Sequence, residues 1–238
     1  MTSLDFVIIG ENIHTTRVLM REGRRIGQNK SGEEIVIYRG PKGENKSMEI
    51  PEIYRETQSF KDGRVKHFMV AISNGMSSDS RLKEEGEDYI EAEIFRQENN
   101  GADFLDLNVD ELSHRINIQK GAMEWLVDLF CAKAHHPPSI DSSSTDILKT
   151  GLNRYLANGS PQGKPMVNSA SLERLEVLDL VSEYESYVIV TSAGSEGMPE
   201  NEHERLDNAQ LMMEECDKRD ISDHQIHIDP LLFPIAVD

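Results

Sequence analysis

The chain has 238 residues, enough for one sizeable core, and its length favours one domain or at most two. Its formal charge is −18, from 25 basic and 43 acidic side chains, which argues against an extended nucleic-acid-binding surface. The sequence has two cysteines, no signal peptide, and no apolar run near the ~20 residues that span a bilayer. We therefore expect a soluble cytoplasmic protein that contains no disulfide framework and does not bind membranes.

The first third of the chain differs in charge from the rest. The apolar run FVIIGEN (6–12) predicts a strand, and EEIVIYRGPKG (33–43) suggests a hairpin. Residues 17–66 carry 12 basic and 8 acidic side chains, a net +4, which leaves −22 for the remainder. We interpret residues 17–75 as an approximate insertion in a single domain of residues 1–238. The run VKHFMVAI (65–72) is expected to be a strand.

Helices and strands alternate in the remaining sequence. The segment 80–102 has apolar residues at helical spacing and ends at Gly101, whereas Pro137 and Pro138 end a later helix. Either Ser143 or Ser144 is expected to cap the next helix. The expected helices cover 80–102, 115–134, 143–158, 171–185 and 204–220, and the expected strands cover 102–109, 138–141, 164–169, 186–193 and 224–232.

This alternation predicts an α/β fold with a parallel sheet covered by helices, either an open doubly wound sheet or a closed barrel. No glycine-rich G-x-G-x-x-G loop follows a strand, which weakens the dinucleotide-binding alternative. Polar residues follow nearly every strand, as in a barrel that builds its site at the carboxyl ends of its strands. We count six principal strands and expect an incomplete TIM-type (β/α) barrel, with about six of eight strands.

The polar residues at the strand ends are the candidate site. They are Asn12, Asp106, Asn108, Asp141, Asn168 and Asp229. In a barrel, Asp141, Asn168 and Asp229 converge on one pocket, where buried carboxylates and amides need hydrogen-bonding partners. A carboxylate accepts two parallel N–H bonds and an amide both donates and accepts, a set that suits an aminopyrimidinone such as a pterin. The alternative for Asp141 is a simple helix cap.

Several strings resemble the pterin-binding barrel family. These are GEN (10–12), LDLNVDE (105–111), AMEWLVDL (122–129), IDSSS (140–144), MVNSAS (166–171) and IDPLLFPIAV (228–237). They look most like the methyltetrahydrofolate:corrinoid methyltransferases and the folate domain of cobalamin-dependent methionine synthase. The resemblance covers residues 4–16 and about 85–238 and leaves out the insertion. Dihydropteroate synthase belongs to the same superfamily, but DLNVDE is closer to the methyltransferase form.

The resemblance implies a substrate, a partner and residue roles. Asp141, Asn168 and Asp229 would hydrogen-bond the pterin, with Asn108, Asp106 and Asn12 lining the same mouth. Asn168 and Asp141 would be the catalytic residues, and methyltetrahydrofolate would pass its N5-methyl group to a cobalamin (corrinoid) carried by a partner protein or domain. N5 of methyltetrahydrofolate is a tertiary amine, which is a poor leaving group. It must therefore gain a proton or a strong hydrogen bond as the methyl group departs.

One departure from the family concerns the end of the sequence. In the family, two further strands follow the IDP strand, and a catalytic Asn stands at the end of strand seven, whereas this sequence stops at Asp238. We expect a truncated barrel without strands seven and eight, so that its status as an enzyme is open. The alternatives are dihydropteroate synthase-like condensation and a non-catalytic folate-binding fragment. We also expect self-association, as a homo-oligomer, across the open barrel.

Other candidate residues have ordinary structural explanations. His135 and His136 fit a helix end better than a metal site, and Cys131 and Cys216 have no partners at zinc spacing. No metal ligand is therefore assigned. His14 lies next to the expected mouth, where it either contacts a ligand or is solvated. The basic insertion could bind a folate tail or a corrinoid phosphate, but plain solvated charge is the favoured interpretation.

Overall fold

The computed structural model describes residues 6–232, and its centre is a six-stranded parallel sheet. The order of neighbouring strands follows the sequence: β1 (Ile9–His14), β7 (Phe104–Asn108), β8 (Pro138–Asp141), β9 (Met166–Ala170), β10 (Tyr187–Thr191) and β11 (Ile226–Asp229). All five strand pairs are parallel. Sequential parallel neighbours are the arrangement of a TIM-type barrel, so the prediction of a partial β/α barrel is confirmed.

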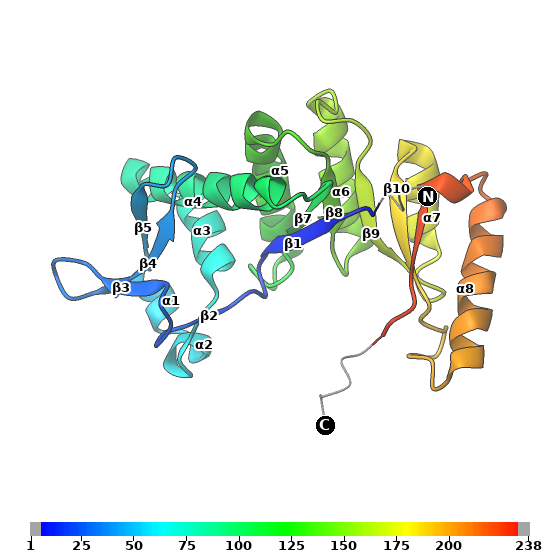
Figure 1. The fold of residues 1–238 in the computed structure, drawn as a ribbon, viewed down its shortest axis with the longest axis horizontal. Coiled ribbons are helices and arrows are strands. Elements are labelled where there is room, and N and C mark those ends of the chain that lie inside the picture. The colour runs from blue at the N-terminus through cyan, green and yellow to red at the C-terminus, as the bar shows by residue number, and fades with distance from the viewer. Residues whose placement is uncertain (1–5, 233–238) are drawn as a thin grey trace, which may run out of the picture.

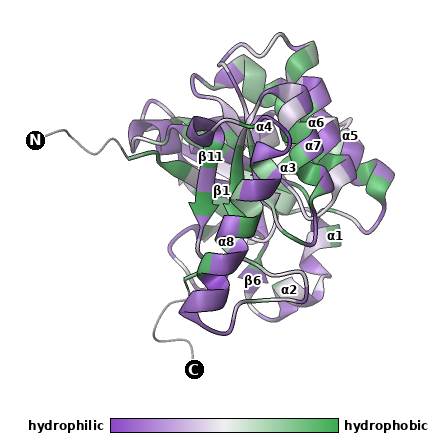
Figure 2. Ribbon diagram, turned by 90° about the vertical axis from the view of Figure 1, so that its right-hand side faces the viewer, coloured by the Kyte–Doolittle hydropathy of each residue, from purple (hydrophilic) through white to green (hydrophobic). Residues whose placement is uncertain are grey.

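A helix lies between each pair of consecutive strands and covers the outer face of the sheet (Figure 1). In chain order these are α4 (Ser80–Asn99), α5 (Ile116–Lys133), α6 (Thr145–Ala157), α7 (Glu176–Tyr184) and α8 (Glu202–Asp217). A short 3₁₀ helix (Asp223–Gln225) precedes β11. Most of these helices bury an apolar face, as α5 does with Met123, Leu126 and Phe130. By contrast, α8 buries only Met212 and Cys216 and is largely hydrophilic (Figure 2).

The two faces of the sheet differ in polarity because side chains alternate along each strand. On β7, Leu105 and Leu107 are fully buried within the apolar core. Asp106 and Asn108 point to the opposite face, which is the inner side of the partial barrel. The same alternation places Ile140 in the core and Asp141 on the inner side. The fold therefore collects polar groups inside the barrel.

The segment between β1 and α4 forms two small antiparallel sheets and three helices. Strands β3 (Ile26–Gln28), β4 (Glu34–Arg39) and β5 (Asn45–Glu49) make one sheet, and β2 (Leu19–Met20) pairs with β6 (Arg64–Val65). The helices are α1 (Glu52–Arg55), α2 (Gln58–Lys61) and α3 (His67–Gly75). This segment occupies one end of the molecule, beside α4 (Figure 1). Its buried Val36 and Met48 belong to the same apolar core as the barrel.

The expected strand at 65–72 is wrong, because His67–Gly75 is helix α3. A continuous apolar run has no period that separates a buried strand from a buried helix. In the structure Phe68, Ala71 and Ile72 are buried, and α3 packs closely along α4. Gly86 makes this approach possible, since a Cβ atom there would lie 2.4 Å from the backbone oxygen of Ala71. No helix in residues 6–232 is long and apolar enough to cross a membrane.

Candidate functional site

A row of polar residues crosses four neighbouring strands at their carboxyl ends. The strand register aligns His14 of β1 with Asn108 of β7, Asn108 with Asp141 of β8, and Asp141 with Asn168 of β9. Residues at matching positions of parallel strands share a face of the sheet, so these four side chains lie side by side on the inner face. Asn108, Asp141 and Asn168 each follow a short apolar run, and His14 is the last residue of β1.

Asn108 connects this row through hydrogen bonds. Its Nδ2 donates to Oδ2 of Asp141 over 3.0 Å, while its Oδ1 accepts from Oγ1 of Thr15 over 3.0 Å and from the Asp110 backbone N–H over 3.0 Å. Nε2 of His14 lies 3.1 Å from the same Oδ2 of Asp141. Three hydrogen bonds therefore orient the Asn108 side chain, and both of these contacts of Asp141 use its Oδ2 atom.

A second carboxyl group, that of Asp106, lies below Asp141 and is almost fully buried. Burial raises the pKa of Asp106 well above its usual range, and the negative charge of Asp141 raises it further. Nδ2 of Asn168 approaches Oδ1 of Asp106 at 3.4 Å. Asp106 therefore keeps its proton to higher pH than a free aspartic acid does.

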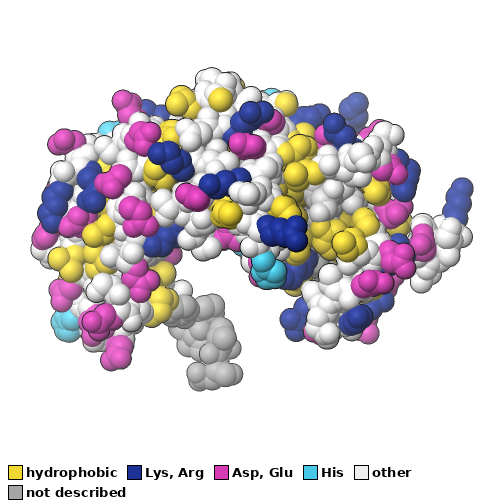
Figure 3. Space-filling model, turned by 180° about the vertical axis from the view of Figure 1, so that it is seen from behind, with side chains coloured by type: hydrophobic (Ala, Val, Ile, Leu, Met, Phe, Trp, Pro, Cys, Tyr) yellow, Lys and Arg dark blue, Asp and Glu magenta, His cyan; other side chains and the backbone are white. Residues whose placement is uncertain are grey.

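These residues open into a cavity of about 420 Å³. It is lined by His14, Thr16, Asn108, Asp110, Glu111, Asp141, Ser142, Ser143, Asn168, Ser169 and Arg174. Asp110 holds the loop after β8, because its carboxylate accepts from Oγ of Ser142 (2.5 Å) and from the Ser143 backbone N–H (2.7 Å). Arg174 donates to the Ser142 carbonyl over 3.1 Å. Seen from behind, the molecule is arched, with histidine and charged side chains along the hollow edge (Figure 3).

The structure brings some of the predicted site residues together and leaves two apart. Asn108, Asp141 and Asn168 line the cavity, whereas the buried Asp106 is outside the lining and accepts from Nδ2 of Asn168. Asn12 lines a separate cavity of about 280 Å³ beside α4, and its backbone N–H donates to Oε1 of Gln97 over 3.1 Å. Asp229 ends β11 at the same edge of the sheet, next to Thr191, and its Oδ1 accepts from the Leu231 backbone N–H over 2.8 Å.

Sequence reasoning missed three residues that shape the cavity. Asp110 and Ser142 stand within the strings DLNVDE and IDSSS, yet neither is a strand-end residue, because both follow the strand ends in loops. Arg174 comes from the segment just before α7, where a single arginine carries no sequence signal. Their roles depend on how two β→α loops pack together. In residues 6–232, no group of three or more His, Cys, Asp or Glu side chains could hold a metal ion.

Comparison with known proteins places this architecture in a family. The family model for pterin binding enzymes matches residues 71–236, more than half of the chain. This chain belongs to the pterin binding enzyme family. The resemblance predicted from the strand-end strings is thereby confirmed, and the matched region contains Asp106, Asn108, Asp141, Asn168 and Asp229.

Two individual proteins, one a curated relative and one a solved structure, are also similar to this chain. The chain is 23% identical over 164 residues to the methylcorrinoid:tetrahydrofolate methyltransferase of Eubacterium limosum, with 66% of this chain and 56% of that protein covered. The chain thus spans just over half the length of this curated relative. A dihydropteroate synthase of Coxiella burnetii, solved in complex with pteroic acid, shares 20% identity with a TM-score of 0.46. That match covers 60% of this chain and 52% of the other.

Proposed function

We propose that this pterin-binding chain holds tetrahydrofolate in the cavity between β1 and β9 and takes part in methyl transfer between N5 of the folate and a corrinoid carried by a partner. The observation that carries the proposal is the row of His14, Asn108, Asp141 and Asn168, a set of donors and acceptors beside the buried Asp106. The name of the Eubacterium limosum relative describes the same pair of reactants.

The cavity suits the edge of a pterin ring. A carboxylate oxygen can accept an N–H bond from the exocyclic amino group or the ring nitrogen of a pterin, and Asp141 is a partly exposed carboxylate whose Oδ2 is held by Asn108 and His14. Asn168 offers an amide that both donates and accepts, which suits a ring carbonyl beside a nitrogen. Arg174, on the rim, is a cation for the developing or permanent negative charge of a folate. We include Asp229 as a pterin ligand from the neighbouring strand end.

The chemistry requires control of a proton at N5. When the methyl group leaves N5, the electron pair of the broken bond stays on nitrogen and must be stabilised by a proton or a hydrogen-bond donor. When bound, the corrinoid supplies the cobalt centre that accepts or donates the methyl group. The residues of this chain contribute by binding and orienting the folate. Asp106, whose pKa is raised by burial and by the charge of Asp141, is a carboxyl group of this site that keeps a proton to higher pH than usual.

A methyl-transfer assay tests the proposal. The chain is mixed with methylcobalamin and tetrahydrofolate, and the loss of methylcobalamin absorbance is followed. We expect Asp141→Asn to lower the rate at least about tenfold, since a charge-assisted hydrogen bond contributes about 1.5–3 kcal/mol. Asp146→Asn is the matched control, because Asp146 is an exposed carboxylate on α6 outside the cavity.

The outcomes separate an enzyme from a binding module. A wild-type chain that binds tetrahydrofolate and yet leaves methylcobalamin unchanged would show that the catalytic part of the proposal is wrong. Equal rates for wild type and Asp141→Asn would show that the reaction uses a different site. A rate that falls only in Asp141→Asn supports both the site and the reaction.

A further inference from the structure

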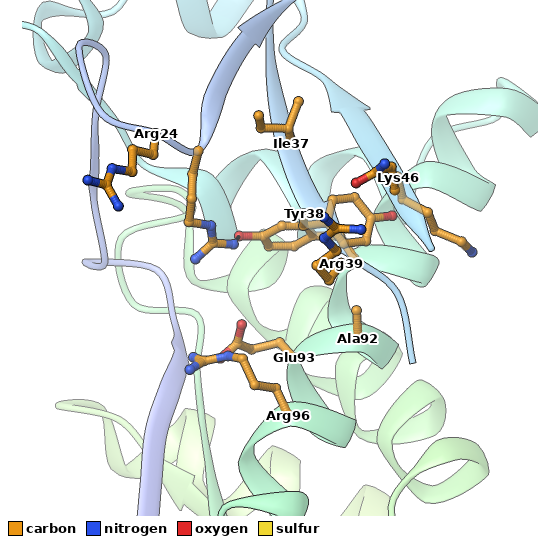
Figure 4. A pocket seen from close by; sticks show the side chains of 11 residues that line it. Arg24, Ile37, Tyr38, Arg39, Lys46, Ala92, Glu93 and Arg96 are labelled. Atoms are coloured by element: carbon orange, nitrogen blue, oxygen red, sulfur yellow. Dashed lines mark hydrogen bonds and ion pairs between the residues drawn. The ribbon is translucent and has the colours of Figure 1, made fainter. Parts of the chain in front are cut away.

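A second cavity, of about 600 Å³, lies between the small sheet β3–β4–β5 and helix α4 (Figure 4). We call it the basic cleft. Its charged and aromatic lining consists of Arg24, Arg25, Arg39, Lys46, Arg96, Glu93, Tyr38 and Tyr89. In Figure 4, Arg39 and Tyr38 lie above Glu93 and Arg96, which come from α4. The cleft shares no lining residue with the strand-end cavity.

Three of its arginines have no acidic partner among the described residues. Arg96 pairs with Glu93, and Lys46 pairs with Asp88 at 2.5 Å. Arg24, Arg25 and Arg39 make no ion pair within residues 6–232, although the whole chain carries a formal charge of −18. The cleft is lined by five cationic side chains and one carboxylate, that of Glu93, so on a strongly acidic protein it forms a local positive potential. This arrangement favours a bound anion.

Buried groups hold one of these arginines in place. Nη2 of Arg25 donates to the hydroxyl of Tyr89, a side chain that is 1% exposed, and Nδ1 of His67 lies 2.8 Å from the same hydroxyl. Burial, together with the nearby charges of Arg25 and Arg96, lowers the pKa of His67 to about 3. His67 is therefore neutral near pH 7 and acts as a fixed hydrogen-bonding partner. Arg25 is thus oriented by the core and is more than a solvated surface charge.

The walls of the cleft also contain flat and apolar groups. The rings of Tyr38 and Tyr89 meet edge to face, with centroids 4.9 Å apart, and Ile37 and Ala92 complete the lining. A cavity of several hundred Å³ has the size that organic ligands occupy. The guanidinium groups of Arg25 and Arg39 supply more donors than one carboxylate can accept, whereas a phosphate offers three oxygens with several lone pairs each.

We propose that the basic cleft binds a phosphomonoester carried by a flat organic group, with Arg25 and Arg39 as the phosphate ligands. The site is independent of the folate cavity and does not rest on the function proposed above. It gives the segment between β1 and α4 a role in ligand binding, in contrast to plain solvation of its charges. Adenosine 5′-monophosphate is a suitable probe because it has both required parts.

Calorimetric titration of the full chain tests this site with three compounds. Adenosine 5′-monophosphate should bind, inorganic phosphate should compete with it, and adenosine should not bind. Raising the salt concentration should weaken binding, because the contacts are ionic. In Arg39→Gln the affinity should fall about tenfold, as expected for loss of one charge-assisted hydrogen bond. Arg39 is exposed and donates only to the Gly43 carbonyl within residues 6–232, so this variant should fold normally.

Lys42→Gln is the control, since Lys42 is an exposed cation on the same hairpin outside the cleft. Unchanged affinity in Lys42→Gln together with a loss in Arg39→Gln supports the site. The proposal is overturned if the nucleotide does not bind at millimolar concentration, if adenosine binds as well as the nucleotide, or if Arg39→Gln binds like wild type. Thermal unfolding of each variant verifies that it is folded.

Discussion

Asp106 is the residue on which the electrostatics of the strand-end cavity depend. It is buried beneath Asp141, and burial together with that neighbouring charge raises its pKa. In the unfolded chain an aspartic acid loses its proton near pH 4, whereas the folded chain keeps this proton to higher pH. Above about pH 4 the unfolded state therefore binds fewer protons than the folded state, and this group destabilises the fold increasingly as the pH rises.

Asp106→Asn should remove that pH-dependent destabilisation. Asparagine has nearly the same shape and never ionises, so the free energy of unfolding of the variant should rise relative to wild type as the pH increases above about 4. Urea denaturation at several pH values measures this difference. A difference that stays constant with pH would show that the pKa of Asp106 is not raised in the folded protein. Asp146→Asn, at an exposed site, should show no such trend.

At the level of single residues, the sequence pattern predicts which residues end the strands, but it does not predict how their side chains are arranged around a cavity. Asn108, Asp141 and Asn168 each end an apolar run, and the structure places all three around one cavity. Asn12 ends such a run too, yet it lines a different cavity with Gln97. A run of residues shows where a strand stops but not which way the last side chain points, and β1 contains a register irregularity between Gly10 and Ile13.

The elements of the barrel can be predicted because each has a clear period and clear ends. Helix α4 begins after Asp79, whose carboxylate accepts from the Arg81 and Leu82 backbone N–H groups, and α5 ends before Pro137. Helix α3 escapes prediction because its apolar run has no helical signature of its own. The close packing of α3 on α4 is a tertiary effect, and so is the basic cleft, which joins residues from three separate segments.

A pair of glycine substitutions tests the packing of these helices. In Gly86→Ala the new methyl group would lie 2.4 Å from the backbone of α3, so we expect destabilisation by about 1–3 kcal/mol. A methyl group added to Gly121 of α5 would meet no atom within 4 Å, and Gly121→Ala should stabilise the helix by about 0.5–1 kcal/mol. Thermal or urea denaturation compares the two. Opposite signs support the close α3–α4 contact, and a neutral Gly86→Ala would contradict it.

At the scale of the whole molecule, the partial barrel leaves two strands with one neighbour each. Within residues 6–232, β1 and β11 are the edges of the sheet. Apolar side chains are exposed near both, including Phe6 and Ile8 before β1 and Ile228 on β11. Exposed edges of this kind pair with other chains. We therefore expect copies of this chain to associate through these edges.

Sedimentation at micromolar concentration measures this association. We expect wild type to sediment as a dimer or larger species, and Ile228→Lys to shift it towards the monomer by placing a charge on the edge. Leu156→Lys is the control, since Leu156 is an exposed apolar residue on α6, away from both edges. A wild-type chain that is monomeric and unfolds cooperatively would contradict the expected association through β1 and β11.

The central claim is that the row from His14 to Asn168 binds the pterin ring, and calorimetric titration with tetrahydrofolate tests it most directly. We expect the wild-type chain and Asp146→Asn to bind with the same affinity, and Asp141→Asn to bind at least about tenfold more weakly because it loses a charge-assisted acceptor. No binding by the wild-type chain, or equal binding by Asp141→Asn, would contradict the claim.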